Sequence, residues 1–225
     1  MGRRVAVVFV VASGGVAAVA QTAYGFSPPS FACTAGVVAY TAAYSYTHAD
    51  DVGPGDYVSL LRAALLAYVA GFVAVRPNGA ERYLALTAFV TASLLDTVDG
   101  AVARRYGGTR LGDGLDVEVD AMGILVGSAV GIAHGWLPGV YIAVGLARYV
   151  FVAGLRIRKA VGATVSDISR SYVRNLLSAL QTAVIALGIA PVVSGSVATT
   201  VAYGVMIPFL VWFLRDWLVV CGRYN

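Results

Sequence analysis

The sequence predicts an all-α integral membrane protein that crosses the bilayer about eight times. Hydrophobic residues make up 59% of its 225 residues and charged residues only 12%, whereas about a quarter of the residues in a soluble domain are charged. The apolar residues also fall into long runs, and one membrane-spanning helix needs about 20 such residues. A chain with so little charge cannot cover a soluble surface. The composition therefore excludes an ordinary soluble protein, a disordered protein and a nucleic-acid-binding protein.

Eight apolar windows follow one another along the chain, and each predicts one helix. The breaks between them contain proline, glycine or charged residues, which end helices. The second window is short, so six crossings remain an alternative. The windows span about residues 5–24, 31–46, 57–75, 83–103, 115–133, 140–155, 176–193 and 197–220.

The positive charges predict how these helices are oriented. If every window crosses, the basic breaks at 3–4, 104–110, 156–174 and 223 all lie on one side, and the other side has only Arg76 and Arg82. Loops rich in arginine and lysine stay in the cytosol. We therefore expect a multi-pass protein of the cell membrane with both termini in the cytosol. Residues 1–20 also fit a cleavable signal peptide, and either reading leaves the remaining topology unchanged.

Half of the acidic residues are gathered in one short segment. Six of the twelve lie within 96–120: Asp96, Asp99, Asp113, Asp116, Glu118 and Asp120. Asp96 and Asp99 are three apart and Asp116 and Asp120 four apart, so the members of each pair share a helix face. The short turn between the two helices makes them antiparallel neighbours. We expect the four aspartates to converge near the cytosolic surface, with Asp113 and Glu118 solvated or packed off the shared faces.

Four converging carboxylates repel one another unless cations lie among them. Oxygen ligands suit Mg²⁺ or Mn²⁺, and two such ions are a common device for displacement at phosphorus. Gly100, Ala103 and Gly112 leave space for a ligand, and Arg104 can bind a phosphate through two N–H groups. The segment therefore predicts a metal-dependent phosphotransfer site at the cytosolic end of the helices.

The same segment resembles the signature of the CDP-alcohol phosphotransferases, which are integral membrane enzymes of phospholipid synthesis. All eight fixed positions of D-x-x-D-G-x-x-A-R-x7-G-x3-D-x3-D are present, from Asp96 to Asp120. The resemblance extends over six helices from about residue 56 to 220. It implies a catalytic domain at 51–225, preceded by about two extra membrane helices within 1–50.

The resemblance also implies a role for each residue of the signature. Asp96, Asp99 and Asp116 would hold the two metal ions, and Asp120 would complete the site and take the proton from the acceptor hydroxyl. The residues that would line the site for the CDP-lipid are Gly100, Ala103, Arg104, Thr109 and Gly112. Thr109 lies in the turn between the helices, so a role in stabilising that turn is equally compatible with its position.

A weaker likeness lies upstream of the signature. The family often begins its first core helix with Asn-x-x-Thr-x-x-Arg, and this chain has Asp56, Ser59 and Arg62 in that register. Ser59 and Arg62 are therefore candidate contacts on the nucleotide side of the donor. The alternative is a helix cap followed by an arginine that reaches toward the membrane surface.

The implied activity is transfer of the lipid phosphate group from a CDP-lipid to a small polar alcohol, with release of CMP. Four arginines near the cytosolic opening of the expected site indicate a phosphorylated acceptor, such as glycerol phosphate or inositol phosphate. They are Arg148, Arg156, Arg170 and Arg174. Arg148 has the alternative of pairing with Asp120.

A proton- or ion-coupled transporter also uses membrane carboxylates, as does an intramembrane prenyltransferase. The transporter predicts acidic groups near the bilayer midplane and broken helices in repeated halves, and the prenyltransferase predicts two separate Asp-rich motifs. This chain has one compact motif near the cytosolic ends of its helices and no repeat. The sequence leaves open whether the protein forms a homodimer.

Overall fold

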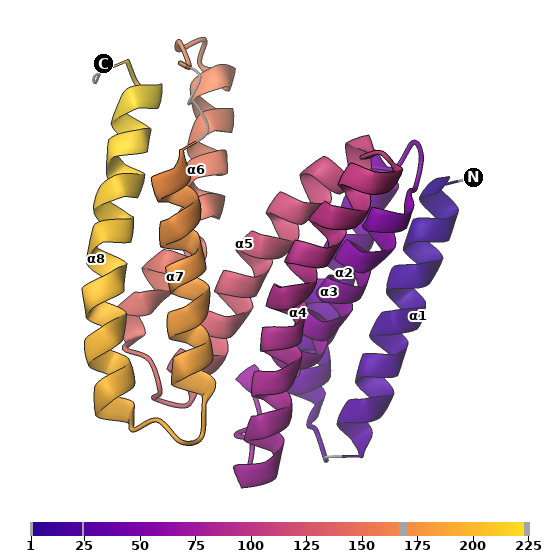
Figure 1. Ribbon diagram of the computed structural model, residues 1–225, viewed down its shortest axis with the longest axis vertical. Helices are drawn as coiled ribbons and strands as arrows, with labels where there is room; N and C mark the ends of the chain where they lie inside the picture. Colours follow the sequence, from indigo (N-terminus) through magenta and orange to yellow (C-terminus); the bar gives the residue numbers. More distant parts are fainter. Residues whose placement is uncertain (1, 24, 167–170, 223–225) are drawn as a thin grey trace.

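The computed structural model describes residues 2–23, 25–166 and 171–222, and these fold into eight α-helices and two short 3-10 turns (Figure 1). No strand occurs within the described residues. The helices are α1 Gly2–Thr22, α2 Pro28–His48, α3 Pro54–Ala70, α4 Gly79–Tyr106, α5 Arg110–Ala133, α6 Ile142–Ala160, α7 Tyr172–Ile189 and α8 Gly195–Val220. The turns are η1 Gly71–Val73 and η2 Gly139–Tyr141. The predicted all-α fold is confirmed, with one helix for each apolar window.

Six of these helices are long and apolar enough to cross a membrane: α1, α3 with η1, α4, η2 with α6, α7 and α8. The other two, α2 and α5, are not among them. Helix α5 carries Asp116, Glu118 and Asp120 in its first half, and α2 is rich in tyrosine, serine and threonine. Both pack against several neighbours in the bundle, α2 against α1, α3 and η1, and α5 against α3, α6 and α7.

The turn between α4 and α5 is set by local sequence. Gly107 ends α4 with a positive φ of 93°, a conformation that glycine adopts without steric penalty. Thr109 then caps α5, because its hydroxyl accepts a hydrogen bond from the amide of Gly112 at 2.9 Å. This short connection makes α4 and α5 antiparallel neighbours, as the sequence predicts.

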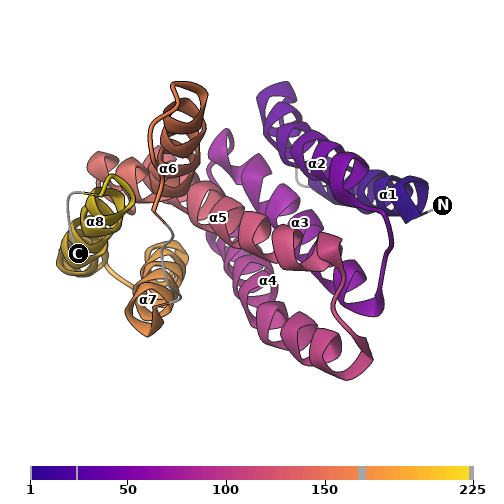
Figure 2. The same ribbon diagram turned by 90° about the horizontal axis from the view of Figure 1, so that it is seen from above.

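The bundle divides into two groups of helices. Helix α3 packs against α1, α2, α4 and α5, while α6 and α7 both pack against α8. Figure 2 shows α5 in the middle, between α3 and α4 on one side and α6 and α7 on the other. Because α5 contacts both groups, its position relative to α3 and α4 decides the geometry of any site between them.

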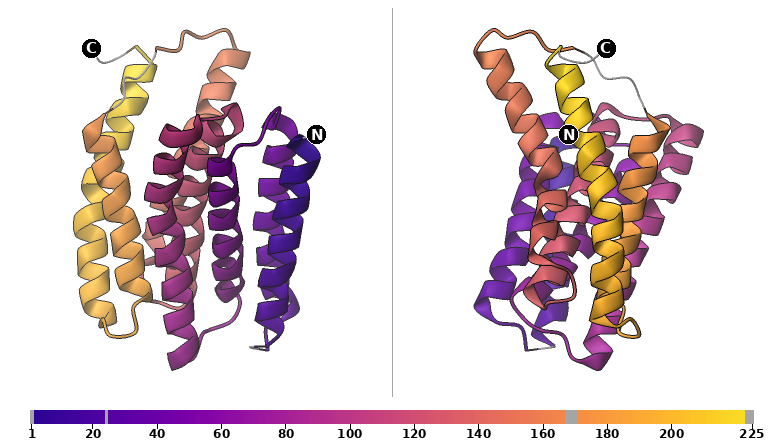
Figure 3. Two further views of the ribbon diagram at one scale, coloured as in Figure 1. Left: turned by 45° about the vertical axis from the view of Figure 1, so that its right-hand side comes forward. Right: turned by 90° about the vertical axis from the view of Figure 1, so that its left-hand side faces the viewer.

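Both ends of the described chain, the turn between α4 and α5, and the segment after α6 lie at one end of the bundle (Figure 3). We call this the basic end, because the arginines at 3–4, 104–110 and 156–158 belong to it. The opposite end holds the connection between α3 and α4 and the turn between α7 and α8. The chain therefore separates its positive charge in space as the sequence predicts.

Candidate metal and nucleotide site

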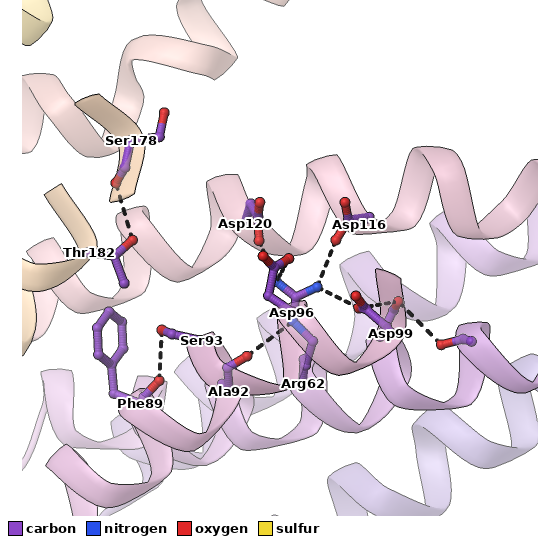
Figure 4. A network of polar contacts seen from close by, with 12 residues as sticks. Arg62, Phe89, Ala92, Ser93, Asp96, Asp99, Asp116, Asp120, Ser178 and Thr182 are labelled. Atoms are coloured by element: carbon purple, nitrogen blue, oxygen red, sulfur yellow. Dashed lines mark hydrogen bonds and ion pairs between the residues drawn. The ribbon is translucent and has the colours of Figure 1, made fainter. Parts of the chain in front are cut away.

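Four aspartates meet around one arginine at the basic end of the bundle. Asp96 and Asp99 come from α4, Asp116 and Asp120 from α5, and Arg62 enters from α3 (Figure 4). The Nη1 of Arg62 donates to Asp99 Oδ2 and to Asp116 Oδ1, both at 2.7 Å. Its Nη2 lies 2.9 Å from Asp96 Oδ1 and also donates to Asp120. The spacing of the aspartates thus brings all four to one place.

Arg62 is held in this position by further contacts. Its side chain is 3% exposed, and its Nε donates to the carbonyl oxygen of Ala92 at 3.1 Å. A guanidinium has five N–H groups; four of them donate hydrogen bonds here, and Asp96 adds an ion pair. Ser59, one turn before it on α3, donates to Asp99 Oδ2 at 2.9 Å. Arg62 and Ser59 thus both contact the carboxylates, and the contact with the nucleotide that the sequence suggests for them stays a prediction.

The cluster has the chemistry of a divalent cation site. Four carboxylates against one guanidinium leave an excess of three negative charges. One oxygen each of Asp96, Asp116 and Asp120 lies within 4.8 Å of the others, and these three side chains are 43%, 43% and 53% exposed. Asp99 is 7% exposed. An all-oxygen donor set that is open on one side suits a hard cation, so the residues present fit Mg²⁺ or Mn²⁺.

A second set of contacts fixes the turn beside the cluster. The hydroxyl of Thr109 donates to Asp56, 2.7 Å from Oδ1 and 2.8 Å from Oδ2, and Asp56 also accepts from the amide of Gly53 at 2.8 Å. A Cβ atom at Gly112 would lie 2.5 Å from Asp56 Oδ1, so only glycine permits this approach. Asp56 joins the start of α3 to the start of α5. For Asp56 a capping role was the alternative reading of the sequence, and the bond to Thr109 was not predicted. The contacts of Thr109 with Asp56 and Gly112 agree with a turn-stabilising role, one of the two roles left open for Thr109.

An open cleft of about 120 Å³ lies between the starts of α3 and α5 and the end of α4. Five residues that the resemblance assigns to the donor line it: Ser59, Gly100, Ala103, Thr109 and Gly112. Asp99 and Asp116 line it as well, so the cleft reaches the carboxylates. Arg104 is exposed beside it, and its Nη1 lies 3.2 Å from the position that a Cβ at Gly100 would take. The glycine thus leaves space next to that guanidinium.

The predicted acceptor arginines lie apart from this cleft. Arg148 donates to Glu118 Oε1 at 2.6 Å, so its observed partner is Glu118, not the Asp120 considered as its alternative. Helix α6 continues to Ala160, which places Arg148 about 18 Å from the helix end at 1.5 Å per residue.

The other three members of the predicted acceptor set have separate surroundings. Arg174 on α7 donates through Nε to Asp216 of α8 at 2.9 Å. Arg156 is exposed near the end of α6. Arg170 lies outside the described residues. The structure therefore does not gather these side chains around one point.

Comparison with known families identifies the chain. The profile of the CDP-alcohol phosphatidyltransferases matches residues 55–214, more than half of the protein. The chain belongs to the CDP-alcohol phosphatidyltransferase family. No curated protein and no solved structure gives a significant match. Membership confirms the resemblance of the signature and supports head-group transfer from a CDP-alcohol. The matched region begins in α3 and ends in α8, so α1 and α2 precede it.

Proposed function

We propose that this protein transfers the lipid phosphate group of a CDP-linked lipid to the hydroxyl of a small polar alcohol and releases CMP. The observation that carries the proposal is the meeting of the four signature aspartates beside a cleft lined by the signature's small residues. A transporter offers no reason for glycine and alanine to line a cleft beside the carboxylates, and the family match favours a transferase.

Asp96, Asp99, Asp116 and Asp120 would hold two divalent cations. Bound ions would neutralise the diphosphate of the donor and stabilise the charge that develops on the departing CMP. Asp99 is the least exposed of the four, and Ser59 and Arg62 fix its Oδ2 from below. The buried Asp99 is therefore held in one position, while the other three carboxylates are more exposed.

The chain's own residues supply proton transfer and orientation. The hydroxyl oxygen of the acceptor attacks the lipid-side phosphorus, and the bond from that phosphorus to the CMP oxygen breaks. Asp120 has the most exposed side chain of the four aspartates, and we assign it to accept the hydroxyl proton. Arg104, at the cleft, orients the diphosphate through its planar fork of N–H groups. Gly100, Ala103 and Gly112 permit the nucleotide to approach the helix backbones.

The location of the site suits a substrate that is partly lipid and partly polar. The cleft lies at the basic end of the bundle, which the positive charges favour as the cytosolic end. The acyl chains of the donor can stay in the bilayer while the acceptor enters from the cytosol. We infer that residues 51–225 form the catalytic domain in the cell membrane, with residues 1–50 as added helices.

We further propose that the acceptor is phosphorylated, as glycerol phosphate and inositol phosphate are. What supports this is the positive charge at the basic end of the bundle, where Arg104, Arg105, Arg110 and Arg156 are all exposed. Arg148 and Arg174 are engaged by Glu118 and Asp216, so Arg156 carries this assignment among the described residues. A panel of acceptors offered with one CDP-lipid tests it, and turnover of serine or free inositol alone would contradict it.

The test of the main proposal is CMP release by the purified protein. With CDP-diacylglycerol, a panel of polar alcohols and Mg²⁺ or Mn²⁺, we expect CMP release that requires both an alcohol and the metal. A chelator should stop it, and Asp116→Asn should abolish it. The matched control is Asp51→Asn, which removes a carboxylate from an exposed position in the connection before α3. Metal-independent turnover, or full activity of Asp116→Asn, would refute the proposal.

A further inference from the structure

The helix α2 lies outside the region that matches the family, yet it contacts the helix that carries half of the carboxylates. Tyr40 of α2 donates its hydroxyl to Glu118 Oε2 at 2.6 Å. Arg148 of α6 donates to the other oxygen, Oε1, also at 2.6 Å. The side chain of Glu118 is 16% exposed. The Glu118 carboxylate on α5 therefore accepts hydrogen bonds from two neighbouring helices, one on each of its oxygens.

Glu118 lies midway between Asp116 and Asp120 on α5. Residues two apart point to opposite sides of a helix, so Glu118 faces away from the aspartate cluster. Arg62 holds Asp116 and Asp120 on one face of α5, and Tyr40 with Arg148 holds Glu118 on the other. These contacts occur within one turn of the helix. Helix α5 is thus clamped from both sides at the depth of the candidate metal site.

A second contact of α2 with α5 lies one turn toward the basic end. A Cβ atom at Gly114 would lie 2.2 Å from the hydroxyl oxygen of Tyr44. Glycine at this position therefore lets the tyrosine ring approach the backbone of α5. Tyr40 and Tyr44 are four residues apart and share one face of α2. The same face of α2 contacts α5 at two successive turns.

Metal sites tolerate little displacement of their ligands. Ligand distances vary by about 0.2 Å in well-formed sites, and a carboxylate oxygen lies several ångströms from its helix axis. A small rotation of α5 about its axis would therefore move Asp116 and Asp120 by more than a site can accept. A carboxylate that is 16% exposed loses stability when its hydrogen-bond partners are removed, so the bonds to Glu118 resist such a rotation.

We propose that Tyr40, Glu118 and Arg148 form a brace through which the added N-terminal helices set the rotation of α5. The three are positioning residues: they act through Asp116 and Asp120 and touch no substrate. The inference rests on the proposed metal-dependent function, in that the brace serves the carboxylates of that site. It makes α2 part of the catalytic unit of this protein, although the family region begins after it.

The test is Mn²⁺ binding by the full-length protein in detergent, measured by electron paramagnetic resonance. Tyr40→Phe removes one hydroxyl and leaves the ring in place. We expect the dissociation constant for Mn²⁺ to rise about tenfold, the typical effect of removing a contact behind a metal ligand. Hydrogen exchange of the α5 amides should rise in the metal-free protein, while Tm falls by less than about 4 °C. The matched control, Tyr46→Phe on the same helix, is 62% exposed and should keep wild-type values.

Glu118→Gln gives a second reading, because the amide oxygen still accepts from Tyr40 while the ion pair with Arg148 is lost. It too should weaken Mn²⁺ binding. Wild-type Mn²⁺ affinity and wild-type α5 exchange in Tyr40→Phe would overturn the brace. If the wild-type protein itself binds no Mn²⁺, the proposed function fails, and the exchange of α5 in the metal-free variant still decides whether the brace exists.

Discussion

Two arginines enter the bundle at its opposite ends, and they find different partners. Arg62, at the basic end, is bound by four carboxylates. Arg82, at the other end, donates to three backbone carbonyl oxygens at the end of α7: Gly188 at 3.0 Å, Ile189 at 2.7 Å and Ala190 at 3.1 Å. Its guanidinium also lies 4.0 Å from the ring centroid of Trp136.

The difference shows when an arginine within the helix bundle is structural and when it belongs to a site. The carbonyl groups at a helix end have no intrahelical donor and carry only partial negative charge, so Arg82 completes α7 and leaves no excess charge behind. Arg62 donates four hydrogen bonds and forms an ion pair with Asp96, but its four carboxylates retain a formal excess of three negative charges. Only the basic end therefore has a physical reason to bind further cations. Four predictions test this contrast.

The largest effect is expected from the aspartates. Asp→Asn at position 96, 99, 116 or 120 removes a ligand charge from the cluster and should lower turnover by about a thousandfold or more. For Asp120 the loss has a second cause, since an amide cannot accept the proton of the acceptor hydroxyl. The measurement is CMP release at saturating Mg²⁺. Substantial activity of Asp120→Asn would contradict its assignment as the proton acceptor.

The two arginines should respond differently to metal when each is replaced by glutamine. Arg62→Gln leaves four carboxylates facing one another, so in chelator the free energy of unfolding should fall by about 3–5 kcal/mol. Added Mg²⁺ should restore part of it, because the cations replace the lost positive charge. Arg82→Gln should cost about 1–3 kcal/mol through unpaired carbonyl groups, and Mg²⁺ should restore none of it. Thermal unfolding in detergent, with and without Mg²⁺, measures both. Equal responses to metal would remove the contrast.

A smaller effect is expected from the arginine beside the cleft. Arg104→Lys keeps the positive charge and loses the planar fork that binds two phosphate oxygens. We expect the KM for the CDP-lipid to rise about tenfold, a loss of about 1.4 kcal/mol, with Tm unchanged. The matched control is Arg105→Lys, whose guanidinium lies over the ring of Tyr106. An unchanged KM and kcat in Arg104→Lys would refute its contact with the donor.

The smallest effect is the pH dependence of stability that His134 causes at the same end of the bundle as Arg82. Burial lowers the pKa of His134 below its ordinary value of 6.5, the positive charges of Arg76 and Arg82 lower it further, and a bond to the Phe72 carbonyl oxygen opposes this. The unfolded chain then binds a proton more readily than the folded protein does. Stability should therefore be complete above pH 6.5 and decline as pH falls from there through the lower folded pKa. Tm measured against pH shows this as a small decrease, which His134→Gln should remove.

The helices and the composition of the site were accessible from local patterns. Apolar windows predicted all eight helices, and the intervals Asp96–Asp99 and Asp116–Asp120 predicted two shared faces on antiparallel neighbours. The role of Arg62 was not accessible in this way. Its spacing from Asp56 and Ser59 suggests a nucleotide contact, and nothing in the local sequence shows that its side chain meets four aspartates of α4 and α5. The bond from Asp56 to Thr109 was missed for the same reason, since 53 residues separate the two.

The sequence by itself determined the properties that depend on neighbours along the chain: which segments are helical, which end carries the positive charge, and which acidic side chains share a face. Hydropathy and helical periodicity express these directly. Only the tertiary structure decided how the helices are rotated against one another. That rotation places Arg62 among four carboxylates, Arg148 against Glu118, and Tyr40 against the same glutamate across 78 residues of sequence. Such pairings depend on packing between helices that are distant in the chain, because a helix with polar groups on two faces has no single inward side until its neighbours are in place.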